Sequence, residues 1–405
     1  MFLRGGKKLF RTTMSGEKIY EGIFAVHKPQ GVTSADVIRK LQHHFNPSDL
    51  FRPWLETERA RRKRESNNQR RRRRTQQLDV KIGHGGTLDP LATGVLVTAV
   101  GKGTKQLQDF LLCTKTYETV VLFGAETDTY DVVGKVVKRA PYEHVTREAV
   151  EKALEQFRGK IMQRPPIFSA LKVNGKKLYE YAREGKEPPI EIKERPVEVT
   201  DLRILEWYEP GTHEYKWPEE APAEEKAAAE KLLAKADSLP AASAAGEADQ
   251  TVSVKRKSPP ADNADSEDAT AEVKKQKVSA EGDAAPAPSE QTDAPDATKT
   301  TSTETQKDTS AQSQPEPQSQ PPAVKITMTV SSGFYVRSLA HDLGKAVGSC
   351  GLMSSLIRSR QADFKLEPGQ VLEYEDLDAG EEVWGPKVKK FLEEWEAKRV
   401  AKDSE

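Results

Sequence analysis

A glycine-rich stretch near residue 90 combines backbone freedom with a single carboxylate. Residues 83–94 read Gly-His-Gly-Gly-Thr-Leu-Asp-Pro-Leu-Ala-Thr-Gly. Glycine permits positive φ and close approach of a ligand, and Pro90 disfavours a helical conformation at Asp89. We therefore expect Asp89 on a shaped loop, where a carboxylate can act as a nucleophile or stabilise a cation. The competing interpretation is that Asp89 merely closes a turn, as most Asp-Pro pairs in loops do.

The residues after this stretch should anchor it to a sheet. Residues 94–100 form an apolar, β-branched run that predicts a buried strand. Gly101-Lys102-Gly103-Thr104 does not match the phosphate-binding loop of NTPases, because Gly103 stands where a hydroxyl is required. The Asp89 stretch is therefore the stronger candidate for chemistry.

Periodic apolar residues predict the elements that surround the loop. Helical spacing is found over residues 34–42 behind Thr33 or Ser34, over 102–112, and from a Thr146 cap to Phe157. Alternation typical of strands is found over 23–26, 115–123, 197–207 and 324–330. We expect the last two strands to pair as neighbours.

Charge is distributed unevenly although 63 basic and 63 acidic residues cancel over the 405-residue chain. Residues 51–78 carry 11 Lys or Arg and 3 Asp or Glu, whereas 219–322 carry 11 and 21. The first block, in a basic insertion over 45–78, has almost nothing to bury; it predicts disorder or a charged helix, and either RNA binding or a nuclear-import signal. The second lies in 211–322, whose composition predicts a disordered insertion.

The remaining parts follow from these insertions. We expect a catalytic domain over 20–210 and 323–375, a basic segment over 1–19, and a charged C-terminal helix over 376–405. The basic start resembles a mitochondrial presequence or a frayed terminus, and small basic islands in 211–322 resemble nuclear-import signals. These features predict nucleus and mitochondrion, with the cytoplasm as a third location.

Metal, disulfide and membrane chemistry find no support in the composition. Only two cysteines occur, too few for a disulfide framework or a thiolate zinc site. The adjacent His341 and Asp342 are expected as a helix surface pair, because no second histidine lies at ligand spacing. No apolar run has the length of a membrane span. We expect no metal, no cofactor and no membrane contact.

Four segments together resemble the TruB family of tRNA pseudouridine synthases. Residues 83–94 closely resemble its catalytic motif, in which the aspartate of Leu-Asp-Pro is the nucleophile. The other matches are 28–34 (Lys-Pro-Gln-Gly-Val-Thr-Ser), 164–185 and 332–344. The resemblance implies an α+β pseudouridine synthase fold with a mixed, mostly antiparallel sheet flanked by helices.

The family's site residues carry over position by position. Asp89, Tyr117 and Arg337 correspond to the catalytic set, with Tyr117 against the target base. We expect Arg337 to pair with Asp89 and keep it ionised. The resemblance also implies substrate contacts, made by His84, Tyr335, Leu356 and Lys28; for Lys28 a structural role is the alternative, and His84 could instead be a loop cap.

The expected activity is isomerisation of the T-loop uridine at position 55 of tRNA to pseudouridine. Whether Asp89 attacks the ribose C1′ or removes a sugar proton stays open. The T arm of tRNA is the expected partner, mRNA is a second candidate, and the chain is expected to act as a monomer. A guide-RNA-dependent rRNA synthase and a non-catalytic tRNA folding factor are the alternatives; the residues after Phe364 are too few for the RNA-binding PUA domain of the guide-dependent branch.

Overall fold

The computed structural model describes residues 11–12, 16–72, 77–184, 186, 192–227 and 320–402. Most of the predicted 211–322 insertion and the import-signal candidates inside it lie outside these ranges, as do most of residues 1–19 and the end of the Arg70–Arg74 run. No helix among the described residues has the length and apolar character needed to cross a bilayer.

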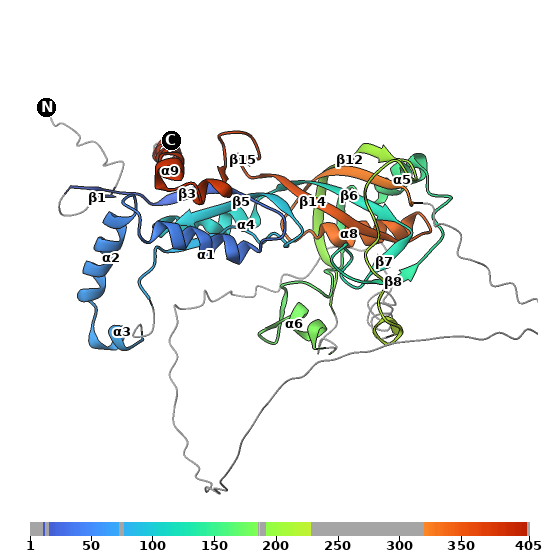
Figure 1. Ribbon diagram of the computed structural model, residues 1–405, viewed down its shortest axis with the longest axis horizontal. Helices are drawn as coiled ribbons and strands as arrows, with labels where there is room; N and C mark the ends of the chain where they lie inside the picture. The colour runs from blue at the N-terminus through green and yellow to red at the C-terminus, as the bar shows by residue number, and fades with distance from the viewer. Residues whose placement is uncertain are drawn as a thin grey trace, which may run out of the picture. The chain divides into compact units, whose positions relative to one another are not determined.

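Ten strands of the described residues form one sheet (Figure 1). Its main path has the order β16-β3-β5-β14-β6-β13-β12-β9, with β4 paired to β5 and β15 paired to β14. The strands are β3 (Gly22–Lys28), β4 (Ile82–His84), β5 (Thr93–Val100), β6 (Lys115–Phe123), β9 (Gly159–Gln163), β12 (Arg195–Tyr208), β13 (Ala323–Val330), β14 (Gly351–Gln361), β15 (Phe364–Lys365) and β16 (Leu372–Glu373). Only the β14–β5 and β16–β3 pairs are parallel. The predicted mixed, mostly antiparallel sheet with flanking helices is confirmed.

Short ribbons accompany this sheet. They pair β1 (Arg11–Thr12) with β2 (Lys18–Ile19), β7 (Ala125–Thr127) with β8 (Val136–Arg139), and β10 (Lys172–Val173) with β11 (Lys176–Lys177). The helices are α1 (Ser34–Phe45), α2 (Arg52–Lys63), α3 (Asn67–Arg72), α4 (Leu107–Leu112), α5 (Arg147–Leu154), α6 (Leu178–Arg183), α8 (Val336–Ala346) and α9 (Glu381–Lys402), with 3₁₀ turns η1 (Gly101–Gln106), η2 (Glu155–Phe157) and η3 (Glu375–Leu377).

The half of the sheet that contains β3 and β5 packs against α1, α2 and α9. Alternating residues of both strands, such as Phe24 and Leu96, face one buried cluster that these helices complete. Thr33 caps α1 in a capping box with Asp36, which decides between the two predicted caps. Leu107 and Phe110 of α4 pack on the opposite face of the same strands.

The other half of the sheet packs against α5 and α8. β6 and β13 run antiparallel over their whole length, and the predicted β12–β13 neighbours pair through eight residues. Thr146 caps α5 as predicted. The predicted helix over 102–112 is divided instead into η1 and α4. β14 connects the halves because it pairs with β5 on one side and β6 on the other.

Parts of both predicted insertions belong to the packed structure. Phe51, Trp54 and Leu55 are buried against β3 and β5, so the expectation that residues 45–78 have almost nothing to bury is wrong for their first third. The basic remainder forms the ends of α2 and α3, the charged-helix alternative. The indole of Trp217 donates to the carbonyl oxygen of Phe123 (2.8 Å) and Ala221 is buried, so the chain stays packed beyond residue 211.

The C-terminal helix α9 is part of the same core. Trp384, Val388 and Leu392 are buried at the spacing of one helix face, and the Trp384 ring lies 4.8 Å from that of Phe45. The sequence predicts a charged C-terminal helix over 376–405, separate from the catalytic domain. Its charged residues are the solvent face of an amphipathic helix.

Truncating Trp384 tests this packing. Trp384→Ala should lower the free energy of unfolding by about 3–5 kcal/mol, because a large buried ring is replaced by a cavity. Urea unfolding measures it, with the exposed Glu394→Ala on the same helix as the control. A loss below about 1 kcal/mol for Trp384→Ala would show that α9 is a dispensable appendage.

Candidate active site

Asp89 lies between β4 and β5, on a segment we call the Asp89 loop (residues 85–92). Gly94 follows it with φ of 109°, and a Cβ at Gly94 would lie 2.3 Å from the carbonyl oxygen of Arg358. This approach is possible only for glycine, and it lets β5 pair with β14 through Gly94 and Arg358. The end of the loop is thereby seated against the central strand.

Buried side chains of β14 hold the first half of the Asp89 loop. Arg358 donates from Nε to the carbonyl oxygen of Val95 (2.7 Å) and from Nη2 to that of Gly86 (3.2 Å). Gln361 donates from Nε2 to the carbonyl oxygen of Gly85 (2.6 Å). No local pattern predicts these roles, because the strand pairing brings the two side chains to the loop.

Side chains near α1 hold the second half. The Ser34 hydroxyl accepts from the backbone N–H of Leu88 (2.9 Å) and donates to its carbonyl oxygen (3.1 Å). Lys28 donates from Nζ to the carbonyl oxygen of Ala92 (2.5 Å). Asp89 is therefore bracketed by fixed backbone on both sides, which limits the rearrangement needed when a substrate arrives.

The predicted ion pair between Asp89 and Arg337 is present. Arg337 Nε lies 2.9 Å from Asp89 Oδ2. The Arg337 side chain is 9% exposed and that of Asp89 is 39% exposed, so the guanidinium lies behind a carboxylate that solvent and ligands can reach. An adjacent guanidinium favours the ionised carboxylate and fixes its orientation.

Arg337 is itself held by three other groups. Nη1 donates to the carbonyl oxygen of Thr129 (3.1 Å) and Nη2 to that of Phe168 (2.9 Å). Nε lies 3.8 Å from the carboxylate of Asp131. Burial raises the pKa of Asp131, while Arg337 opposes that rise. One buried cation thus serves two carboxylates, one enclosed and one open to a ligand.

Comparison with known proteins identifies the family of the chain. The sequence model of the TruB family pseudouridylate synthase N-terminal domain matches residues 71–217. The tRNA pseudouridine synthase 4 of Schizosaccharomyces pombe is 38% identical to this chain, over 88% of this chain and 83% of the relative. The chain belongs to the TruB family of pseudouridine synthases.

Other relatives extend the comparison. The tRNA pseudouridine synthase 4 of Saccharomyces cerevisiae is 34% identical over 92% of this chain and 85% of its own length. Mouse pseudouridylate synthase TRUB1 is 40% identical over 47% of this chain and 51% of its own length. Among solved structures, a chain of a Cbf5-Nop10-Gar1 complex aligns with a TM-score of 0.44 and 16% identity, over 96% of this chain and 64% of that chain.

Two further expected TruB site residues belong to the buried apolar cluster that reaches the Asp89 loop. Tyr117 of β6 and Leu356 of β14 are buried in the apolar cluster that also contains Leu88 and Leu91. These two leucines flank Asp89 in sequence, so the cluster forms an apolar wall next to the carboxylate. A ring in such a wall can stack on a nucleobase.

His84 and Tyr335 lie at the ends of secondary-structure elements, His84 just before the Asp89 loop and Tyr335 at the start of α8. His84 ends β4 half-buried, and burial lowers its pKa, which favours a neutral ring. Tyr335 precedes α8, and both its backbone groups bond to the side-chain amide of Gln163, at 2.8 and 3.0 Å. This pair of hydrogen bonds fixes the start of α8 two residues before Arg337.

Lys28 is enclosed by the fold. It is fully buried, and its Nζ also donates to the carbonyl oxygen of Pro29 (2.7 Å). Burial lowers its pKa to about 8, an effect that the charge of Asp89 opposes. These contacts favour the structural role for Lys28, in which it holds the end of the Asp89 loop.

A pH-dependent stability follows from Lys28. Between about pH 8 and 10.5 the native chain has lost this proton while the unfolded chain retains it, so stability rises with pH in that window. Relative to Lys28→Met, the wild type should gain up to about 3 kcal/mol across it. Urea unfolding of both proteins at pH 7, 9 and 10.5 measures the gain.

Lys389→Met, which removes an exposed lysine from α9, is the control for lost charge. A wild-type advantage over Lys28→Met that stays constant with pH would contradict the assignment.

His341 was expected on a helix surface and is buried instead. Its ring stacks on that of Tyr130 (3.9 Å, 15°), and Nδ1 lies 3.6 Å from Glu126 Oε1. Tyr130 has a positive φ of 64° and stands between Thr129 and Asp131, the residues that contact Arg337. In the described part of the chain, no cluster of three or more His, Cys, Asp or Glu side chains is arranged to hold a metal ion.

Proposed function

We propose that this TruB-family chain converts the T-loop uridine at position 55 of tRNA to pseudouridine, with Asp89 as the carboxylate on which cleavage depends. The observation that carries the proposal is the Asp89–Arg337 ion pair, with an accessible carboxylate in front of a buried guanidinium. It supports chemistry rather than turn closure, because a loop aspartate does not need a buried cation.

The reaction is an isomerisation without redox change or added water. The N-glycosidic bond breaks, the base turns while retained by the site, and C5 of the base bonds to the ribose C1′. The proton leaves C5, and N1 of the product carries one. Asp89, oriented by its ion pair with Arg337, either bonds to C1′ or takes a ribose proton as the base departs.

The neighbouring residues fit the other needs of this reaction. Tyr117 and Leu356 would retain the loose base against the apolar wall, and Tyr117 is the candidate to assist loss of the C5 proton. The target uridine must leave its stack, at a cost of a few kcal/mol. His84 is the candidate to occupy the vacated space, since its neutral ring can stack between bases.

Guide-free modification tests the proposal. The purified chain is incubated with an unmodified tRNA transcript, and pseudouridine is mapped chemically. We expect one new pseudouridine, at position 55, without guide RNA. A guide-RNA-dependent synthase would give none until guide RNA is added, and a folding factor would bind the tRNA without product.

The proposal also covers the oligomeric state, the RNA partners and the cellular location. We propose that a monomer acts on the T arm and on mRNA hairpins that present a similar loop, in nucleus and mitochondrion. Sedimentation of the chain with and without T-arm RNA tests whether it acts as a monomer. Imaging of the full-length tagged protein tests the location, and exclusion from both nucleus and mitochondrion would contradict the proposal.

A further inference from the structure

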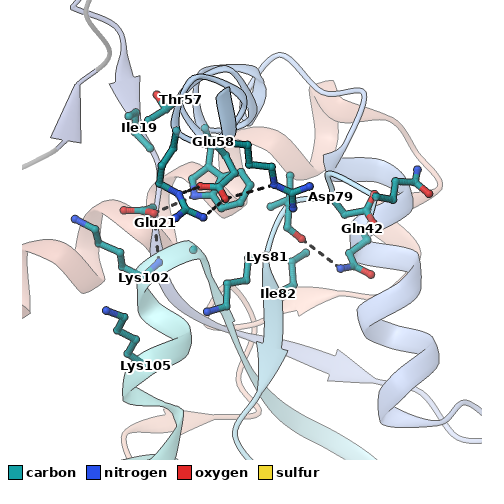
Figure 2. A pocket seen from close by; sticks show the side chains of 16 residues that line it. Ile19, Glu21, Gln42, Thr57, Glu58, Asp79, Lys81, Ile82, Lys102 and Lys105 are labelled. Atoms are coloured by element: carbon teal, nitrogen blue, oxygen red, sulfur yellow. Dashed lines mark hydrogen bonds and ion pairs between the residues drawn. The ribbon is translucent and has the colours of Figure 1, made fainter. Parts of the chain in front are cut away.

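A groove of about 800 Å³ lies beyond the end of β5 that is remote from the Asp89 loop (Figure 2). It is bounded by α2, by the residues that lead into β4, and by η1. We call it the α2–η1 groove. A volume of this size accommodates several groups of a ligand.

The groove has a surplus of positive charge. Its charged lining residues are Arg61, Arg62, Lys81, Lys102 and Lys105 against Glu21, Glu58 and Asp79, five cations and three carboxylates. The difference is +2.

The three carboxylates already have donors within the fold. Glu21 accepts from the indole N–H of Trp54 (2.9 Å), and Arg61 donates from Nε to Glu58 (2.7 Å). Asp79 accepts from the side-chain amide of Asn46 (2.9 Å). The acids are therefore committed to holding α2 and the approach to β4.

The three lysines are not committed in this way. Lys81, Lys102 and Lys105 are exposed, and none of their amino groups makes an ion pair or a side-chain hydrogen bond with another described residue. Figure 2 shows Lys81 and Lys105 below Glu58 in the view and Lys102 beside Glu21, whose carboxylate accepts from the backbone N–H of Lys102 (3.3 Å). Three exposed ammonium groups around one hollow suit an anionic ligand with several charges.

The distance to Asp89 decides which ligand this is. β5 has eight residues, from Thr93 beside the Asp89 loop to Val100 beside the groove. Seven steps of a strand span roughly 23 Å. A group in the α2–η1 groove is therefore remote from the nucleotide at Asp89.

We propose that the α2–η1 groove binds the sugar-phosphate backbone of the substrate RNA outside the loop that enters the active site. The inference rests on the proposed function, which supplies a polyanion long enough to reach both places. Lysine binds phosphate as a flexible point charge without reading sequence, as a backbone contact requires. The ends of α2 and α3 add further exposed basic side chains, those of Lys63, Arg64, Arg70 and Arg71.

Binding of two RNAs tests the groove. The triple variant Lys81→Ala, Lys102→Ala, Lys105→Ala is placed in the Asp89→Asn background, so that no turnover disturbs binding. Its affinity for an unmodified full-length tRNA and for a short T-arm hairpin is measured over a series of salt concentrations. The matched control is Lys389→Ala, Lys390→Ala, Lys398→Ala, which removes three exposed lysines of α9.

The groove variant should bind full-length tRNA roughly tenfold more weakly near 0.1 M salt, with a log–log salt slope shallower by about 2 to 3, since each lost phosphate contact removes about 0.9. Its affinity for the hairpin, and the affinities of the α9 control for both RNAs, should change less than about twofold. An unchanged affinity for tRNA, an equal loss on the hairpin, or an equal loss in the α9 control would overturn the proposal.

Turnover separates this inference from the proposed function. With Asp89 intact, the groove variant should modify the short hairpin at the wild-type rate. If the wild type forms no pseudouridine on either RNA, the proposed function fails whatever the binding data show. If product forms normally and the groove variant binds tRNA as the wild type does, only the groove proposal fails.

Discussion

Asp89→Asn is expected to abolish pseudouridine formation while RNA binding is retained. Asparagine has nearly the same shape and can still accept from Arg337, but it lacks the charge that must meet the ribose. Removal of a group on which covalent chemistry depends lowers turnover by roughly 10⁴ or more. The measurement is the single-turnover rate on unmodified tRNA, with protein in excess.

The control is Asp109→Asn, which neutralises an exposed aspartate of α4. It should retain the wild-type rate, and both variants should bind the T-arm hairpin as the wild type does. Product from Asp89→Asn at more than about one hundredth of the wild-type rate would reduce Asp89 to a turn residue, the interpretation that its Asp-Pro context alone favours.

Changes at Arg337 are expected to damage both stability and turnover. Arg337→Ala leaves Asp131 buried without its cation, and breaking such a pair costs about 3–5 kcal/mol. Arg337→Lys keeps the charge but loses the fork that reaches Thr129 and Phe168 while Nε faces Asp89. For the lysine variant we expect kcat to fall roughly 10²- to 10³-fold with a smaller loss of stability.

Arg360→Lys is the control, since Arg360 of β14 is half-buried and, among the described residues, donates to Thr116 and Ala362 rather than to a carboxylate. Its kcat should stay within a few fold of the wild type. Full turnover in Arg337→Lys would show that Asp89 needs a nearby charge but not this geometry, and unchanged unfolding of Arg337→Ala would show that Asp131 does not depend on it.

The elements around Asp89 were predictable because their signals are local. The run over 94–100 is buried on both faces of a central strand, and the cap at Thr33 is formed by residues within one turn. The Asp89–Arg337 pair has no local signal, because its members lie 248 positions apart in the sequence. The family resemblance predicts this ion pair, whereas hydrophobic periodicity does not.

Asp131 shows what local patterns miss. The run Thr-Asp-Thr-Tyr-Asp resembles a surface turn, yet the N–H of Val132 donates to the carbonyl oxygen of Met353 (3.1 Å) and the turn packs against β14. The sequence left two roles open for Lys28 for a similar reason, since its burial depends on contacts with the distant Asp89 loop. In both cases a charged residue is enclosed by a contact made far along the chain.

The high charge of α2 and α9 obscures the buried faces of these two helices in the sequence. Arginines dominate α2, but Pro53, Trp54 and Leu55 at its start are buried. Along α9, residues 384, 388 and 392 repeat every four positions and mark a buried face between charged ones. This four-residue spacing is visible in the sequence, although the many charged residues of the helix obscure it.

The most direct test of the central claim is a crystal structure of Asp89→Asn bound to a T-arm RNA. The account predicts that the target uridine is out of its stack, with its base against Tyr117 and its ribose within about 3.5 Å of the side chain of residue 89. A uridine that remains stacked in the RNA, or one bound in the site with its ribose remote from residue 89, would contradict it.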